Sequence, residues 1–288
     1  MKLMTNDPNK QPVVLLDGLT FPEGPRWRDG RLWFSDFYAH EVIAVDLLGN
    51  REHIIEVPGQ PSGLGWTPNG QLLVVSMTDR RLLRLDTNGL TEVANLFEFA
   101  NYHCNDMVVD DDGRAYVGNF GFNSHAGDPF RAANLIRVDP DGTVSVAATN
   151  LAFPNGSVIT PDGQTLIVGE TRGNILTAWD RAPDGGLSNR RIWAHLDGGF
   201  PDGICLDANG AVWVADPRNK ETIRVMEGGE ITDRISTGNR GSFACMLGGP
   251  ERRTLFICTC LQSGPGTAEL RSGRIETLEV SVPGAGWP

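Results

Sequence analysis

The sequence lacks any long apolar segment. No run of about 20 apolar residues occurs in the chain, so we expect no membrane-spanning helix and no membrane partner. The N-terminal stretch MKLMTNDPNKQPVVLL has neither the uninterrupted apolar core nor the cleavage site of a secretory signal, which favours a cytoplasmic protein. No segment keeps a helical period, which argues against a parallel α/β fold.

Positive charge is also scarce. The chain has 25 Lys and Arg against 36 Asp and Glu, a formal net charge of −11, and no Lys/Arg cluster offsets this balance locally. A nucleic-acid backbone would be repelled by such a surface, so we expect no nucleic-acid partner. The acidity suits a cationic ligand, although most of it is expected to be a solvated surface.

Cysteine is rare and irregularly placed. The five cysteines are odd in number and form no CxxC pair, so we expect buried free thiols in a reducing compartment. The GxSxG signature of a nucleophilic serine is missing as well, so that type of hydrolase mechanism has no support.

What the sequence has in quantity is turn residues, arranged in a repeat. The 35 Gly and 18 Pro are spread along the whole chain. One unit recurs, in which a residue next to Gly is followed by an apolar run, a turn pair and a second apolar run. Its six copies are FPEGPRWRDGRLWFSD (21–36), PSGLGWTPNGQLLVVSM (61–77), CNDMVVDDDGRAYVGN (104–119), FPNGSVITPDGQTLIVGE (153–170), FPDGICLDANGAVWVAD (200–216) and the divergent FACMLGGPERRTLFICT (243–259). The apolar runs are rich in Val, Ile, Leu and Trp, which is typical of buried antiparallel strands.

The spacing of the repeat predicts the fold. Turn pairs join the apolar runs of the first five copies, and both positions of such pairs tolerate a positive φ. These pairs are Asp29-Gly30, Asn69-Gly70, Asp112-Gly113, Asp162-Gly163 and Asn209-Gly210. Copies follow one another at 39 to 50 residues, the length of a four-stranded propeller blade.

We therefore predict an all-β fold, a six-bladed β-propeller with four antiparallel strands per blade. It forms one domain over residues 1–288, with residues 1–12 loosely ordered. Residues 273–284 are expected to add a strand that closes the ring by pairing with the N-terminal region.

One repeat position carries side chains that the fold does not require. The position just before the repeated glycine is occupied, in order, by Glu23, Ser62, Asn105, Asn155, Asp202 and Ala244. Equivalent positions of a propeller face one another around the central channel. Two carboxylates and two amides at such positions are costly to bury without a compensating charge.

A hard divalent cation is the compensation that we predict there. Ca²⁺ binds carboxylate and amide oxygens together with water, and the absence of thiolate or imidazole from the set argues against copper. The site is central and its predicted ion is Ca²⁺, with Zn, Mn, Fe or Mg as alternatives. The plainer reading is that Asn-Gly and Asp-Gly simply form turns at the starts of strands. For four such residues in one register, the metal is the better explanation.

These motifs also resemble those of a known family. FPEGPRW, the FPNG and FPDG repeats and the terminal FACMLGGPERRTLF…GRIETLEVSVPGAG are similar to the regucalcin (senescence marker protein)/gluconolactonase family, from about Gly18 to Pro288. The resemblance implies a six-bladed propeller and a metal-dependent lactonase. It implies that Glu23, Asn155 and Asp202 bind the metal, that Asn105 contacts the metal or the substrate, and that Asp202 is the general base.

The sequence departs from the family pattern at one point. Sugar lactonases similar to regucalcin have Arg-x-Asn-Asp where this chain has His103-Cys104-Asn105-Asp106. Histidine is not equivalent to the multi-donor arginine fork. His103 is expected either to orient the substrate and shuttle a proton or to pack at the rim.

A distinct loop, GNFGFNSHAGDPFRAAN (118–134), is expected to lie over the mouth of the channel. Asn119 and Phe120 are expected to contact the substrate. Phe120, together with Phe122 and Phe130, predicts an apolar pocket and a lactone less polar than an aldonolactone.

The predicted function is metal-assisted hydrolysis of a small lactone. The metal would polarise the carbonyl, and Asp202 would take a proton from the attacking water. Two alternatives stay open: a phosphotriester hydrolase resembling diisopropylfluorophosphatase, and a calcium-binding propeller without catalysis. The expected partner is a small-molecule substrate.

Overall fold

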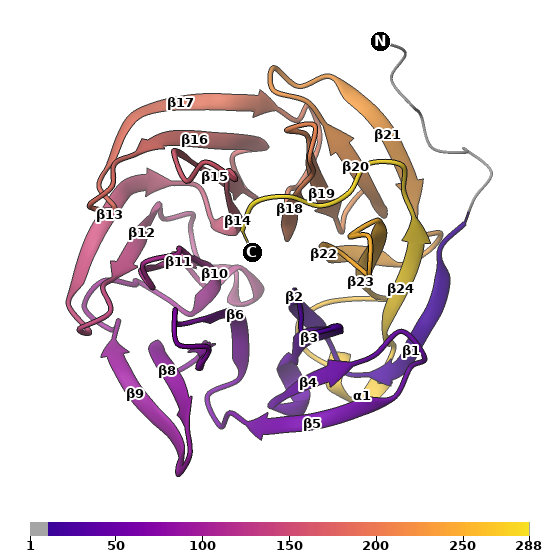
Figure 1. Cartoon of the computed structure of the whole chain (residues 1–288), viewed down its shortest axis with the longest axis horizontal. Helices are drawn as coiled ribbons and strands as arrows, with labels where there is room; N and C mark the ends of the chain where they lie inside the picture. The colour runs from indigo at the N-terminus through magenta and orange to yellow at the C-terminus, as the bar shows by residue number, and fades with distance from the viewer. Residues whose placement is uncertain (1–10, 288) are drawn as a thin grey trace.

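Each repeat folds into one antiparallel sheet because its apolar runs pair with each other as neighbouring strands. The computed structural model describes residues 11–287, and six four-stranded sheets surround a central channel in these residues (Figure 1). The predicted six-bladed propeller is therefore confirmed. The expectation of loose order for residues 1–12 falls mostly on residues 1–10, which lie outside the described residues.

The strands occupy four positions, from the channel outward. The innermost strands are β2 (Pro22–Arg28), β6 (Pro61–Trp66), β10 (Cys104–Val109), β14 (Pro154–Ile159), β18 (Ile204–Leu206) and β22 (Gly241–Gly248). The second strands are β3 (Arg31–Asp36), β7 (Leu72–Ser76), β11 (Ala115–Asn119), β15 (Thr165–Glu170), β19 (Val212–Asp216) and β23 (Thr254–Cys260). The third are β4 (Glu41–Val45), β8 (Arg81–Asp86), β12 (Ala133–Val138), β16 (Ile175–Arg181), β20 (Glu221–Val225) and β24 (Gly273–Glu279). The outermost are β5 (Arg51–Glu56), β9 (Gly89–Asn95), β13 (Val144–Leu151), β17 (Leu187–His195), β21 (Ile231–Ser236) and β1 (Val13–Leu19).

Within residues 11–287, helical structure is confined to three short segments between strands. They are the 3₁₀ turns η1 (Phe37–Ala39) and η2 (Ser124–Ala126) and the helix α1 (Thr267–Leu270). Among residues 11–287, no helix has the length and apolar character needed to cross a membrane.

The ring closes through the two ends of the chain. β24 pairs antiparallel with β1, from Val13 opposite Thr277 to Leu19 opposite Gly273, so the last blade combines strands from both termini. This confirms the predicted closure. The segment after β24 continues across the ring to its centre (Figure 1), where Trp287 exchanges two backbone hydrogen bonds with Ile159. Ile159 ends its strand, so this tail covers the end of the channel at which the inner strands finish.

The hairpin turns differ from one another in a way the sequence did not show. Asp29 and Gly30 both have positive φ, 50° and 76°, as expected for a two-residue turn. In the other four predicted pairs only the glycine does. At Gly70, for example, the amide donates to the carbonyl of Thr67 at 2.8 Å, so the loop has three residues and the glycine takes the left-handed position.

Glycine at the repeated position allows adjacent inner strands to touch. A Cβ on Gly63 would lie 2.4 Å from the Met107 nitrogen, and one on Gly156 would lie 2.4 Å from the Ile204 nitrogen. Gly156 also donates its amide to the carbonyl of Asp202 in the next blade, at 3.1 Å. The inner strands run in the same direction along the channel, so the residues before these glycines gather at the same end.

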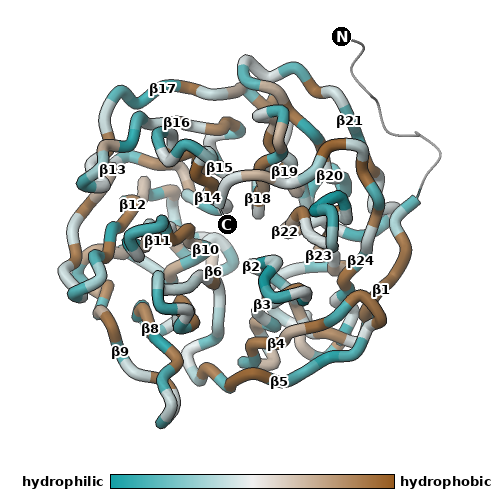
Figure 2. The backbone as a smooth tube through the Cα atoms, viewed as in Figure 1, coloured by the Kyte–Doolittle hydropathy of each residue, from teal (hydrophilic) through white to brown (hydrophobic). Residues whose placement is uncertain are grey.

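Apolar packing is distributed around the ring. Six clusters of buried side chains lie within and between blades, the largest around the closing blade and its neighbours. Figure 2 shows apolar residues in all six blades, with hydrophilic residues frequent in the outer strands and turns. Each blade therefore packs on its two neighbours.

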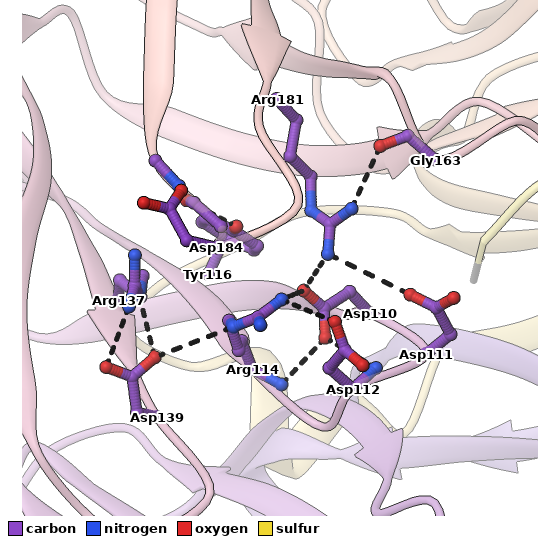
Figure 3. A network of polar contacts seen from close by, with 12 residues as sticks. Asp110, Asp111, Asp112, Arg114, Tyr116, Arg137, Asp139, Gly163, Arg181 and Asp184 are labelled. Carbon is purple, nitrogen blue, oxygen red and sulfur yellow. Dashed lines mark hydrogen bonds and ion pairs between the residues drawn. The ribbon is translucent and has the colours of Figure 1, made fainter.

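A buried ion network joins the third and fourth blades, where the inner strands end (Figure 3). The Asp110 carboxylate accepts hydrogen bonds from the guanidinium of Arg181 and from Arg114 Nη1, the latter at 3.2 Å. Only 1% of the Asp110 side chain is exposed, against 57% for Asp112. Asp110 is therefore the buried carboxylate that links the two arginines. Asp112 also pairs with Arg114, at 2.7 Å, and Asp111 lies 3.8 Å from Arg181.

We expect Asp110→Ala to lower the free energy of unfolding by about 3–5 kcal/mol, because the Arg181 side chain, 6% exposed, would lose its close buried carboxylate and keep only Asp111 at 3.8 Å. Asp112→Ala, which removes an exposed carboxylate from the same turn, should cost less than about 1 kcal/mol. Urea unfolding of the two variants and the wild type measures the difference. Equal losses would contradict the structural role given to Asp110.

Candidate functional site

A pocket of about 440 Å³ opens at the end of the channel where the inner strands begin. Its floor is formed by polar residues that precede or occupy the repeated glycine positions. Glu23, Asn105 and Asn155 come from β2, β10 and β14, and Asp202 from the segment before β18. The structure thus brings together the four predicted metal residues. Ser62 and Ala244, from the other two blades, do not line the pocket.

Glu23 and Asp202 are held in an environment that disfavours their charge. Burial raises the pKa of Glu23 well above its usual value, and the neighbouring Asp202 raises it further. Burial likewise raises the pKa of Asp202, whereas a hydrogen bond from Asn155 lowers it. Two carboxyl groups that repel each other in a pocket indicate a missing positive charge.

The one arginine near them is already neutralised. Arg26 lies in the channel with 3% of its side chain exposed and pairs with Asp106 at 2.6 Å. Its guanidinium also donates to the carbonyls of Leu64 at 3.0 Å and Met107 at 2.5 Å. Arg26 and Asp106 therefore cancel, and the charges of Glu23 and Asp202 remain uncompensated by any ion pair in the described part of the chain.

The two asparagines add neutral donors and acceptors to this floor. The Nδ2 of Asn155 donates to the hydroxyl of Thr171 at 3.2 Å. The Nδ2 of Asn105 is buried without any hydrogen-bond partner. An unpaired buried amide beside a pocket is expensive unless a ligand satisfies it, so Asn105 is suited to contact whatever occupies the site.

The chemistry of this set fits a hard divalent cation. Two uncompensated carboxylates supply two negative charges, and amide oxygens complete the preferred ligand type of Ca²⁺ or Mg²⁺. A second acidic group, Asp110, Asp111 and Asp112, has carboxylate oxygens within 4.8 Å of one another. It lies at the other end of the channel, and Arg114 and Arg181 already balance Asp110. The pocket floor is therefore the better candidate metal centre.

The predicted substrate residues divide into two groups. His103 and Phe120 line the pocket. Asn119 does not, because it is fully buried and both ends of its amide support the loop: Nδ2 donates to the Asn134 carbonyl at 2.8 Å and Oδ1 accepts from the Gly121 amide at 3.1 Å. Its position gives it a supporting role for the loop and leaves it no free polar atom for a substrate.

The walls of the pocket are largely apolar, but mostly not through the residues that we expected. Phe122 packs against Phe130 and Phe153 outside the lining, and Phe130 is 58% exposed. The apolar part of the lining instead consists of Phe21, Phe37, Met77, Phe120, Phe153 and Phe243. Polar side chains lie beside it, such as Gln60, Asn123, Ser124, Ser263 and Glu269. The repeat contained a signal for two of the phenylalanines, since Phe21 and Phe153 stand two residues before Glu23 and Asn155 in the FPEG and FPNG motifs.

Aromatic contacts fix the shape of these walls. Phe120 stacks on Phe153 with ring centroids 4.7 Å apart and an interplanar angle of 9°. Phe21 meets Phe243 edge-on at 4.6 Å. His103 stacks on Tyr102 at 4.0 Å, and burial together with the charge of Arg80 lowers the pKa of His103. His103 is therefore neutral at pH 7 and able to accept a proton.

Two loops cover the mouth. The loop between β23 and β24 carries α1, and the amide of its Gly264 donates to the Tyr38 hydroxyl at 3.1 Å. The His125 ring, from η2 in the other loop, packs directly against Gly264. Although His125 is exposed, as expected for an isolated histidine, it lines the pocket, and nothing in the sequence indicated this contact.

Comparisons with known proteins agree with the propeller fold. The profile of the SMP-30/gluconolactonase/LRE-like region matches residues 21–261. The 6-deoxy-6-sulfogluconolactonase of Pseudomonas putida is 26% identical over 97% of this chain and 96% of its own length, and a pentonolactonase of Haloferax volcanii is 25% identical over 85% and 84%. The structure of a protein from Agrobacterium tumefaciens described as calcium-binding regucalcin superposes with a TM-score of 0.81 at 22% identity, covering 99% of each chain. At that identity the structural likeness speaks for the fold.

We expect chelator-treated Glu23→Gln to unfold at a higher temperature than chelator-treated wild type at pH 7.5. The pKa of Glu23 is raised in the folded state, so its destabilising charge is fully present above the folded-state pKa and absent below the ordinary value of 4.5. The difference in melting temperature should therefore shrink as the pH falls toward 4.5. Elemental analysis of the same variant without chelator should show loss of bound metal.

The exposed Glu227→Gln is the matched control and should change neither quantity. A Glu23→Gln protein that is less stable than wild type at pH 7.5, or that keeps its full metal content, would refute the charge assignment.

Proposed function

The chain belongs to the SMP-30/gluconolactonase/LRE-like family, and we propose that it is a metal-dependent lactonase that hydrolyses a small cyclic ester. The observation that carries this proposal is the convergence of two uncompensated carboxylates and two amides on the floor of one pocket. The lactonase names of the relatives with 25–26% identity support the reaction class. The odd number of cysteines supports a reducing compartment, and we place the protein in the cytoplasm on that ground.

Glu23, Asn155 and Asp202 would hold the cation, with Asn105 within reach of it or of the substrate. Ca²⁺ is our preferred ion because the oxygen set is hard and mixed, and Zn, Mn, Fe and Mg are the alternatives to test. A divalent cation bound there would polarise the ester carbonyl and stabilise the charge that develops on its oxygen.

Three side chains of the pocket would carry out the remaining steps of the hydrolysis. Asp202 would take the proton of the attacking water, since it lines the pocket beside the proposed cation. The unpaired Nδ2 of Asn105 is placed to donate to an oxygen of the substrate. Neutral His103 would hold the ring-opened hydroxyl or relay its proton.

The pocket lining favours a neutral lactone of low polarity. It contains no Lys or Arg, so a sulfonated or phosphorylated lactone would find no cationic side chain for its anionic group. A sugar lactone needs partners for several hydroxyls, each unpaired buried group costing about 1–3 kcal/mol. The phenylalanines of the lining offer none and reward apolar substrate surface, although Gln60, Asn123 and Ser263 bring polar groups to the same pocket.

We expect Asp202→Asn to lower kcat on an apolar γ- or δ-lactone by about 10²–10⁴-fold, because it removes the proposed base. The exposed Asp197→Asn, five residues earlier in the chain, is the control and should keep wild-type kinetics. Chelation should abolish wild-type turnover, and added Ca²⁺ or another divalent ion should restore it.

A panel of lactones and phosphotriesters separates the rival functions. Turnover of phosphotriesters alone would favour the phosphotriester hydrolase. Tight calcium binding without turnover of either class would favour the non-catalytic propeller.

We expect Phe120→Ala to lower kcat/KM for alkyl- or aryl-substituted lactones about tenfold, the loss that corresponds to about 1.4 kcal/mol of buried apolar contact. Phe130→Ala is the matched control, since Phe130 belongs to the same loop but does not line the pocket. Steady-state kinetics on gluconolactone, xylonolactone and the apolar lactones measures both. A higher wild-type kcat/KM for gluconolactone than for every apolar lactone would refute the proposed preference.

A further inference from the structure

Thr171 stands directly after β15. It contacts the side chain of Asn155 and the backbone next to Asp202, two residues of the candidate metal site. Its backbone amide donates to the Phe153 carbonyl at 3.0 Å, which fixes the residue beside β14. Its hydroxyl lies 2.7 Å from the carbonyl oxygen of Pro201, the residue before Asp202. The same hydroxyl lies 3.2 Å from Nδ2 of Asn155. Thr171 does not itself line the pocket.

The proton count at this hydroxyl has only one solution. A carbonyl oxygen can only accept, so the single hydroxyl proton of Thr171 must go to Pro201. The hydroxyl oxygen can then only accept from Asn155. An amide presents a nitrogen at one end and an oxygen at the other, and the nitrogen must therefore face Thr171.

The other contacts of the Asn155 amide support the same orientation. Asn155 also hydrogen-bonds the carboxylate of Asp202, and an ionised carboxylate can only accept, so this contact too requires the nitrogen end of the amide. No donor in the described part of the chain reaches Oδ1. The oxygen is therefore the free end of a side chain that is 4% exposed and lines the pocket.

An Asn155 amide turned the other way would greatly weaken the binding of a cation. The partial positive charge of its N–H groups would replace an oxygen ligand, although the side chain would keep its shape and packing. Groups that orient the direct ligands of a metal typically change its affinity by 10- to 100-fold when they are removed.

We propose that Thr171 is a positioning residue of the metal centre, which locks the Asn155 amide with its oxygen toward the channel and so raises the affinity for a hard divalent cation. This inference rests on the proposed function, because it needs the pocket floor to bind a metal.

The experiment compares Thr171→Val, which keeps the shape but removes the hydroxyl, with Thr171→Ser, which keeps the hydroxyl. Calcium affinity of the chelator-treated full chain is measured by isothermal titration calorimetry. We expect Thr171→Val to weaken binding about tenfold or more and Thr171→Ser to stay within about threefold of wild type. Melting temperatures of the metal-free proteins confirm that each variant is folded, and Thr171→Ala replaces Thr171→Val if the latter is not.

Asn155→Asp provides a second, independent test. A carboxylate has oxygens at both ends and needs no orienting partner, so Thr171→Val should change affinity less than about twofold in this background. An equal loss in both backgrounds would mean that Thr171 acts through the chain at Pro201, and the orientation argument would be overturned. Wild-type affinity in the Thr171→Val single variant would overturn it as well.

The wild-type titration separates this inference from the proposed function. A wild-type protein that binds none of Ca²⁺, Mg²⁺, Mn²⁺ or Zn²⁺ would overturn both. Wild-type binding with unaffected variants would overturn the role of Thr171 alone.

Discussion

The close approach of the inner strands around the axis is the constraint on which the rest of this structure depends. At Gly63 and Gly156 the next blade lies where a Cβ would have to be, so the ring is as tight as the backbone permits. A tight ring leaves little room along the axis, and the residues just before these glycines meet at one end of it. The same packing that closes the propeller therefore builds the floor of the pocket.

The floor is arranged so that one charge pair is satisfied and another is not. Arg26 and Asp106 neutralise each other and tie three blades together through backbone carbonyls. Glu23 and Asp202 have no such partner. Their pKa values are raised because the charged carboxylates are unfavourable in this buried position. Folding tolerates this cost because the ring and its blades hold the two carboxylates in place. A bound divalent cation would offset the repulsion between the two carboxylates, which would then serve as its ligands.

Above the floor, the pocket combines a polar base with aromatic walls. The stacked pair Phe120 and Phe153 and the edge-on pair Phe21 and Phe243 make these walls rigid. His103, where related sugar lactonases have arginine, is neutral and supplies fewer donors. The pocket thus combines a polar floor with a large apolar surface. Substrate choice within this architecture is decided by the walls and loops.

The sequence by itself determined the architecture and the floor of the site. Repeat symmetry converts equal positions along the chain into equal positions around an axis. Six copies therefore implied six blades, and one register picked out Glu23, Asn105, Asn155 and Asp202. Only the tertiary structure decided what surrounds them. The loops carry no repeat, and their paths depend on contacts with residues distant in the chain, such as Tyr38 with Gly264. Packing of this kind put Phe153 in the wall in place of Phe122, because the propensities of a loop sequence do not encode which blade it will meet.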